Sequence, residues 1–185
     1  RDLVRSRGLG DVYKRQVIML LLTTLPLLAT ARNDDWRLVW SDEFNTEGRL
    51  SPSVWNYEQG YVRNEEAQWY QPDNAVCKGG FLVIEARKER NRQNPLYIPG
   101  SNDWRKEREF IEYTSSSVTT AGKKEFLYGR FEVRARIPVA KGAWPAIWTL
   151  GSNMEWPSCG EIDIMEYYQI KGVPPVSYTH LRAHE

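Results

Sequence analysis

Cysteine and histidine are scarce in this chain, and their scarcity limits the chemistry available to it. The 185 residues include two cysteines, Cys77 and Cys159, and two histidines, His180 and His184. Two cysteines do not make a disulfide framework, and we expect both to be unpaired, largely buried thiols. Both histidines lie close to the C-terminal end, so the body of the chain gives no support to histidine-based catalysis or to a zinc site.

A charge excess and long apolar runs are also absent. Lysine and arginine number 25 and aspartate and glutamate 24, for a formal net charge of +1 at pH 7. A near-neutral chain gives no electrostatic argument for binding nucleic acid. The apolar run from Met19 to Leu28 is shorter than the about 20 residues that span a bilayer. We therefore expect a monomer with no nucleic-acid partner and no stable membrane insertion.

The same apolar run fits a secretory signal. Ala29-Thr30-Ala31 follows it with the small-x-small pattern of a cleavage site, which predicts a signal peptide over residues 17–31 and a secreted protein, extracellular or periplasmic. Residues 1–16 are basic and have no initiator ahead of the run, and residues 176–185 follow Pro174-Pro175 abruptly. We expect both ends to be foreign, adapter-like sequence. Residues 32–175 then form one partial domain.

Within that domain, turn residues separate many short segments of strand character, and helical periodicity is almost absent. Residues 37–40 and 80–86 are predicted strands, and residues 131–137 alternate most clearly between apolar and charged side chains. Residues 87–109 are rich in charge, Asn, Pro and Gly, which predicts a loop. Strands at this density without crossover helices predict an all-β fold, a two-sheet antiparallel sandwich.

Three acidic residues interrupt the apolar pattern of residues 160–168. Glu161 and Asp163 share one face of a strand, because successive side chains point to opposite sides. Regular alternation would turn Glu166 away, whereas one extra residue, inserted as a β-bulge, returns it to that face. Mutual repulsion then predicts that at least one of the three holds its proton to a higher pH than an isolated acid.

Two carboxylates on one face can supply a nucleophile or base together with an acid. A separation of about 5–5.5 Å is typical of retaining glycosidases, and one of about 6.5–9.5 Å is typical of inverting ones. The spacing along the sequence does not choose between them. An exposed acidic strand edge or a cation site are the alternatives.

The run Glu161-Ile-Asp163-Ile-Met-Glu166 resembles the bulged E-x-D-x-x-E signature of glycoside hydrolase family 16. The preceding Trp156-Pro-Ser-Cys-Gly160 is similar to the family's laminarinase branch of endo-β-1,3-glucanases. The resemblance covers about residues 36–175, with further motifs at residues 40–45, 64–70, 128–134 and 142–148. It implies a concanavalin-like β-jelly roll, incomplete at the C-terminus because further strands follow this one in the family.

By the same resemblance, Glu161 is the nucleophile, Glu166 the general acid/base, and Asp163 the residue that tunes their protonation. The implied activity is retaining hydrolysis of internal β-1,3 or mixed β-1,3/1,4 glucosidic bonds, with a polysaccharide as partner and no required cofactor. Two alternatives stay open. One is a galactan hydrolase of the agar or carrageenan type in the same family, and the other is a non-catalytic β-glucan-binding protein, although such relatives usually lose the glutamates.

Five further residues are candidates for binding the sugar chain. The amide of Asn64 can exchange hydrogen bonds with hydroxyls, and Arg130 offers a fork of donors or an ion pair with a neighbouring acid. Trp144 and Trp148 would share a face if both lay on a strand, where they would stack on sugars or pack in the core. Trp156 resembles the laminarinase tryptophan that lines the site beside the cleaved bond.

Members of the family often hold a structural calcium ion away from the catalytic residues. Glu43 and a carbonyl of the Lys78-Gly79-Gly80 turn occupy the matching region. Calcium takes 6–8 oxygen ligands, and the resemblance places a remaining protein ligand beyond this chain. We therefore expect calcium at most as a structural ion.

The predicted foreign ends can be tested directly. We expect the native gene to continue past Pro175, because a sandwich of this type needs more strands than the sequence supplies. Sequencing the source DNA across both junctions checks this. A genomic reading frame that encodes residues 176–185 followed by a stop codon would contradict it.

Overall fold

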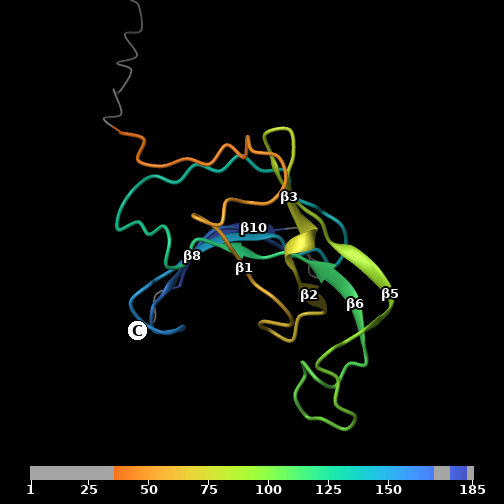
Figure 1. Ribbon diagram of the computed structural model, residues 1–185. Helices are drawn as coiled ribbons and strands as arrows, with labels where there is room; N and C mark the ends of the chain where they lie inside the picture. The colour runs from red at the N-terminus through yellow and green to blue at the C-terminus, as the bar shows by residue number, and fades with distance from the viewer. Residues whose placement is uncertain (1–35, 169–175, 183–185) are drawn as a thin grey trace, which may run out of the picture. The chain divides into compact units, whose positions relative to one another are not determined.

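The computed structural model describes residues 36–168 and 176–182. The chain divides into two units, residues 1–39 and 40–185, and all the strands lie in the second (Figure 1). The predicted adapter-like start and signal peptide lie outside the described residues. No helix within the described ranges is long and apolar enough to cross a membrane. The regular elements are β1 (Asn56–Tyr57), β2 (Gln68–Tyr70), the 3₁₀ helix η1 (Pro72–Asn74), β3 (Ala75–Cys77), β4 (Leu82–Ile84), β5 (Arg87–Gln93), β6 (Phe110–Ser115), β7 (Val118–Thr119), β8 (Ala146–Leu150), β9 (Glu161–Tyr168) and β10 (Val176–Arg182).

The strands pair into small sheets, which confirms the predicted all-β class. Two sheets have three strands, in the orders β2-β6-β5 and β10-β9-β8, and two have two strands, β1-β7 and β3-β4. Every pair is antiparallel except β2 with β6. The purely antiparallel arrangement predicted from the sequence is wrong at that pair. The long connection between β2 and β6 allows a parallel crossover, which a short turn cannot make.

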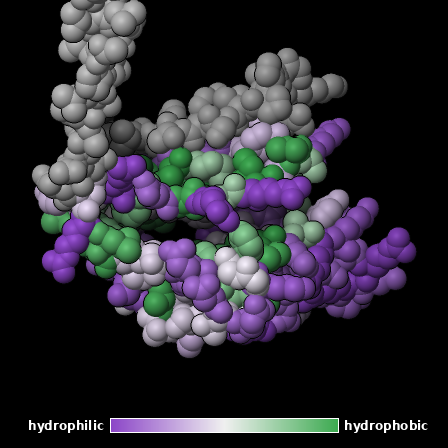
Figure 2. All heavy atoms as spheres, turned by 90° about the horizontal axis from the view of Figure 1, so that it is seen from above, coloured by the Kyte–Doolittle hydropathy of each residue, from purple (hydrophilic) through white to green (hydrophobic). Residues whose placement is uncertain are grey.

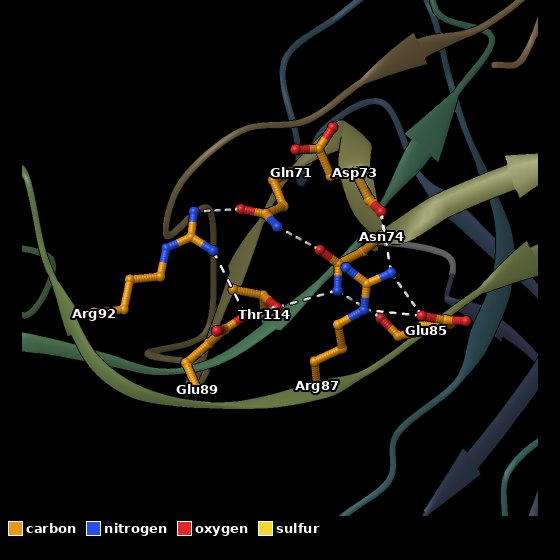
Figure 3. Close-up of polar contacts among 8 residues, drawn as sticks. All are labelled: Gln71, Asp73, Asn74, Glu85, Arg87, Glu89, Arg92 and Thr114. Atoms are coloured by element: carbon orange, nitrogen blue, oxygen red, sulfur yellow. Dashed lines mark hydrogen bonds and ion pairs between the residues drawn. The ribbon is translucent and has the colours of Figure 1, made fainter. Parts of the chain in front are cut away.

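A buried asparagine joins η1 to the neighbouring strands (Figure 3). Asn74 is 0% exposed, and its amide donates hydrogen bonds to the Glu85 carbonyl at 2.8 Å and the Thr114 hydroxyl at 3.1 Å. Thr114, also 0% exposed, donates to Glu89 at 2.6 Å, and Gln71 donates to the Asn74 side-chain oxygen at 2.6 Å. Buried polar groups need such partners, so this network specifies how η1, β5 and β6 meet.

Part of the predicted loop over residues 87–109 is a strand. β5 covers Arg87–Gln93 and pairs with β6, with extra residues on β5 between Lys88 and Arg92. β5 forms the edge of its sheet, and an edge strand tolerates charged side chains because they discourage pairing with other chains. The irregular loop is therefore shorter and runs over residues 94–109.

Two predicted strands are not formed. Residues 37–40 and 131–137 have no strand structure, whereas residues 80–86 contain β4 as predicted. A strand needs a hydrogen-bonded neighbour, and residues 131–137 pair with none of the described strands. The apolar side chains of Phe131 and Val133 are exposed. Figure 2 shows that hydrophobic residues also reach the surface on the face it presents.

The two cysteines are unpaired, as predicted. Cys77 is buried in β3, and Cys159 is half-buried just before β9. Burial raises the pKa of the Cys77 thiol, with a smaller contribution from Asp42. Cys77 therefore stays protonated at neutral pH and acts as a small apolar core residue.

The tail segment excluded from the predicted fold contains β10. Its backbone pairs antiparallel with β9, from Val176 opposite Tyr168 to Arg182 opposite Glu161. The foreign origin of residues 176–185 stays a prediction.

Replacing Asn74 with alanine should strongly destabilise the domain. The change leaves the Glu85 carbonyl and the Gln71 amide without a buried partner, which we expect to lower the free energy of unfolding by about 2–4 kcal/mol. Urea denaturation measures it, with the exposed Asn102→Ala as the matched control, expected within about 0.5 kcal/mol of the parent. Equal effects of the two substitutions would show that the network contributes little.

Candidate active site

The register of β9 against β8 contains the predicted bulge. Glu166 lies opposite Ala146 and Met165 opposite Ile147, but Trp148 is opposite Asp163, so one residue of β9, Ile164, has no counterpart. The pairing of β10 with the other side of β9 shifts at the same place. An extra residue seen from both neighbours belongs to β9 itself.

The bulge places the three carboxylates on one side of the sheet. Glu161, Asp163 and Glu166 pair with Leu150, Trp148 and Ala146, which are alternate residues of β8 and therefore share a face. We call this side of β9 the acidic face. Asp163 is 7% exposed, whereas both glutamates are only half-buried. The inner acid is thus the most shielded from solvent, and its two neighbours are accessible.

Each glutamate accepts a hydrogen bond from a tryptophan. The Trp144 indole N–H donates to Glu166 Oε1 at 2.9 Å, and the Trp156 indole N–H donates to Glu161 Oε2 at 2.9 Å. Both indoles are more than half exposed, at 52% and 57%. Trp144 lies before the start of β8, so the alternation that would place it on one face of a strand with Trp148 does not apply. Its ring nevertheless reaches the acidic face. The structure therefore brings both tryptophans to the carboxylates.

Trp148 lies on the acidic face through its pairing with Asp163, and an arginine covers part of its ring. The Arg63 guanidinium lies 5.6 Å from the Trp148 ring centroid and 5.7 Å from that of Tyr70. Arg63 also forms an ion pair with Glu58. Sequence reasoning missed Arg63, which is adjacent to the motif at residues 64–70 but outside it.

Asn64 occupies a strained turn next to Arg63. Asn64 and Glu65 have φ angles of 54° and 52°, and the Glu66 N–H donates to the Arg63 carbonyl at 3.1 Å, which closes the turn. Left-handed backbone is uncommon for residues other than glycine and is often associated with functional sites. The Asn64 side chain is exposed. Through Arg63, this turn is connected to Trp148 and hence to the acidic face.

Glu66, Gln68 and Tyr70, which follow the turn in the chain, form a hydrogen-bonded group that sequence analysis did not identify. The Tyr70 hydroxyl donates to Glu66 at 2.7 Å, and the Gln68 amide reaches Glu66 and the Tyr70 oxygen, both at 2.8 Å. Burial and the neighbouring Glu66 raise the pKa of Tyr70, so its hydroxyl remains a donor. All three belong to the motif at residues 64–70, whose resemblance carried no role for them.

Arg130 and Glu43 are the remaining candidates. Arg130 forms an exposed ion pair with Glu132 at 2.6 Å, the alternative that the sequence left open. The predicted calcium region is at Gly80. A Cβ atom placed on Gly80 would lie 3.6 Å from the Asn45 side-chain oxygen and 3.9 Å from the Glu43 carbonyl oxygen, so both oxygens are close to this region. Calcium takes 6–8 oxygens, and the described residues contain no cluster of three metal-ligating side chains. Calcium binding stays a prediction.

Comparison with known proteins confirms the resemblance that the motifs suggested. Residues 101–175 match the family model of the XgeA-like catalytic GH16 domain. A beta-glucanase from Rhodothermus marinus is 39% identical over 173 residues, which cover 86% of this chain and 54% of that protein. The chain thus spans about half the length of this curated relative.

Two solved structures share the fold. The laminarinase from Rhodothermus marinus has a TM-score of 0.56 at 42% identity, covering 71% of this chain and 49% of that one. The second structure is described for endo-acting O-glycanases, which members of the human gut microbiota express to initiate mucin breakdown. Its TM-score is 0.64 at 38% identity, and the match covers 80% of this chain and 60% of that one. Both likenesses support the jelly-roll assignment.

The two indole hydrogen bonds predict selective changes in a nitrogen-15 NMR spectrum. Glu161→Ala should move the indole N–H signal of Trp156 upfield, and Glu166→Ala should move that of Trp144, because each loses a charged acceptor. Glu132→Ala is the control, because it removes a carboxylate that pairs with Arg130 and accepts neither indole hydrogen bond, and it should leave both indole signals in place. Unmoved indole signals in the first two variants would show that the hydrogen bonds do not form in solution.

Proposed function

We propose that this chain, whose resemblance to glycoside hydrolase family 16 the comparisons confirm, is the catalytic part of a retaining endo-β-glucanase acting on β-1,3 or mixed β-1,3/1,4 linkages. The observation that carries the proposal is the bulge in β9, which places two accessible glutamates on either side of a buried aspartate on one face. The similarity to a beta-glucanase and to a laminarinase structure favours a glucan as the substrate.

In this proposal Glu161 is the nucleophile. Its Oε2 accepts the Trp156 N–H, which leaves Oε1 to attack the anomeric carbon as the glycosidic bond breaks. The product of that step is a glycosyl ester on Glu161. The indole fixes the rotation of the carboxylate, so the attacking oxygen is already oriented before substrate arrives.

Glu166 is the proposed general acid and then the base. Its Oε1 accepts the Trp144 N–H, and an indole can only donate, so the acidic proton belongs on the other oxygen. That oxygen gives its proton to the leaving glycosidic oxygen, and afterwards takes a proton from the water that hydrolyses the ester.

Asp163 is proposed to tune the two glutamates. It is buried on the acidic face, between their positions on β9. A charge placed there acts on both neighbouring carboxylates, so Asp163 can influence how protons divide between them. That at least one of the three acids holds its proton to a higher pH than an isolated acid stays a prediction.

The proposed sugar contacts are the exposed rings of Trp144 and Trp156, the part of Trp148 not covered by Arg63, and the Asn64 amide. We also propose that the protein acts outside the cytoplasm, because the apolar run that ends at Leu28 resembles a secretory signal. A second candidate is a hydrolase of mucin glycans, or of galactans such as agarose and carrageenan, with the same mechanism. The likeness to a structure described for O-glycanases that initiate mucin breakdown favours the first of these substrates.

The activity can be tested with a panel of polysaccharides. We expect reducing ends to be released from laminarin and mixed-linkage glucan, and not from agarose, carrageenan or mucin glycans. Glu161→Gln should abolish turnover while leaving binding to laminarin nearly unchanged, because it removes the nucleophile and keeps the shape.

Three results would change the proposal. Cleavage of agarose, carrageenan or mucin alone would select the second candidate. Binding of laminarin without cleavage by the parent protein would indicate a glucan-binding protein. Turnover of Glu161→Gln at the parental rate would contradict the role of Glu161.

The stereochemistry of the first product tests the mechanism. Two displacements at one carbon restore the original configuration, so proton NMR should show the β-anomer before mutarotation sets in. Early appearance of the α-anomer would mean inversion, with water rather than Glu161 attacking the sugar.

A further inference from the structure

Two arginines of the loop over residues 94–109 bind the backbone of the turn that carries Asn64. Arg105 donates to the carbonyls of Tyr61 and Val62, at 3.1 and 3.2 Å. Arg108 donates to the carbonyls of Glu66 and Glu65, at 2.8 and 3.0 Å. We call Arg105 and Arg108 the arginine clamp. Each uses the planar fork of donors that lets a guanidinium bridge two acceptors.

The arginine clamp is itself held firmly. The buried side chain of Asn94 donates to the backbone carbonyls of Arg105 and Arg108, at 2.9 and 2.8 Å. The two guanidinium groups lie 4.6 and 5.8 Å from the Trp104 ring centroid, and that of Arg108 lies 5.2 Å from the Tyr61 ring centroid. Cation–π contacts of this kind fix the planes of the guanidinium groups.

The turn needs this support because of its backbone. Asn64 and Glu65 both have positive φ, and for Glu65 this conformation is unfavourable in isolation. Such a conformation persists when the surrounding structure determines it. The carbonyls of Glu65 and Glu66, which Arg108 binds, lie at the end of the strained pair.

We infer that the arginine clamp is a positioning device for the substrate, and that it presents Asn64 and Arg63 to the hydroxyl groups of a polysaccharide on the acidic face. The inference rests on the proposed function for the identity of the ligand. Arg63 links the turn to the acidic face, because its guanidinium packs on the ring of Trp148, the residue of β8 that pairs with Asp163. The four hydrogen bonds described above join Arg105 and Arg108 to the turn's backbone, so the arginine clamp acts on the sugar through the turn.

Steady-state kinetics of the purified protein on laminarin test the inference. Arg108→Ala should raise KM by about tenfold and change kcat by less than about twofold, because it disturbs binding and not the carboxylates. Arg108→Lys keeps the charge but lacks the fixed planar fork of donors that the guanidinium presents to the two carbonyls, so its KM should fall between those of the parent and Arg108→Ala. Arg90→Ala, on an exposed arginine of β5, is the matched control and should leave both constants unchanged.

A second substitution separates positioning from general damage. Glycine adopts positive φ readily, so Glu65→Gly should remove much of the need for Arg108. We expect KM of the double variant Arg108→Ala/Glu65→Gly to return to within about threefold of the Glu65→Gly variant. A full tenfold penalty in both backgrounds, or a loss confined to kcat, would overturn the inference.

Hydrogen exchange provides a readout that does not depend on activity. The Glu66 amide closes the turn, and its exchange should accelerate in Arg108→Ala and slow again in the double variant. If the parent protein cleaves no glucan, the proposed function fails while this measurement still decides whether the arginine clamp holds the turn. If Arg108→Ala does not fold, Arg108→Lys carries the same comparison, and an unchanged Glu66 amide there would refute it.

Discussion

One additional residue in β9 determines what the acidic face can do. If the strand alternated regularly through Ile164, with no bulge there, Glu166 would point to the side opposite Glu161 and Asp163. The bulge is shared by the pairings with β8 and β10, so it cannot shift along the strand without breaking the register on both sides. A local backbone irregularity thus sets the relative orientation of all three carboxylates, and the tryptophans act on groups already in place.

The most local features were the most predictable from the sequence. The common face of Glu161 and Asp163 follows from strand alternation, and the bulge that adds Glu166 follows from the resemblance to the bulged E-x-D-x-x-E signature. The two unpaired cysteines follow from their small number. Residues 131–137 have an equally clear pattern but no strand, because pairing depends on a neighbour that a local pattern does not contain. The charged segment Arg87–Gln93 was misread for the opposite reason, since an edge strand needs no apolar face.

The supports of the site were the least predictable. Arg63, Arg105 and Arg108 lie far from Glu161 in the chain, and each works through contacts between distant segments. Two kinds of support result. Indole N–H groups hold the carboxylates through their side chains, whereas guanidinium groups hold the turn through its backbone. The first kind could be anticipated from motifs, because Trp144 and Trp156 lie within them; the second leaves no spacing pattern.

The arginine clamp recognises carbonyl oxygens, which every amino acid possesses. Val62 and Glu65, which the clamp binds only through their carbonyls, can therefore exchange side chains during evolution, provided that the number of residues between Tyr61 and Glu66 does not change. A single insertion or deletion there would move the carbonyls out of reach of both guanidinium groups. Divergent homologues should accordingly vary at these two positions far more than in the length of the segment, which makes loop length the more informative guide when their sequences are aligned.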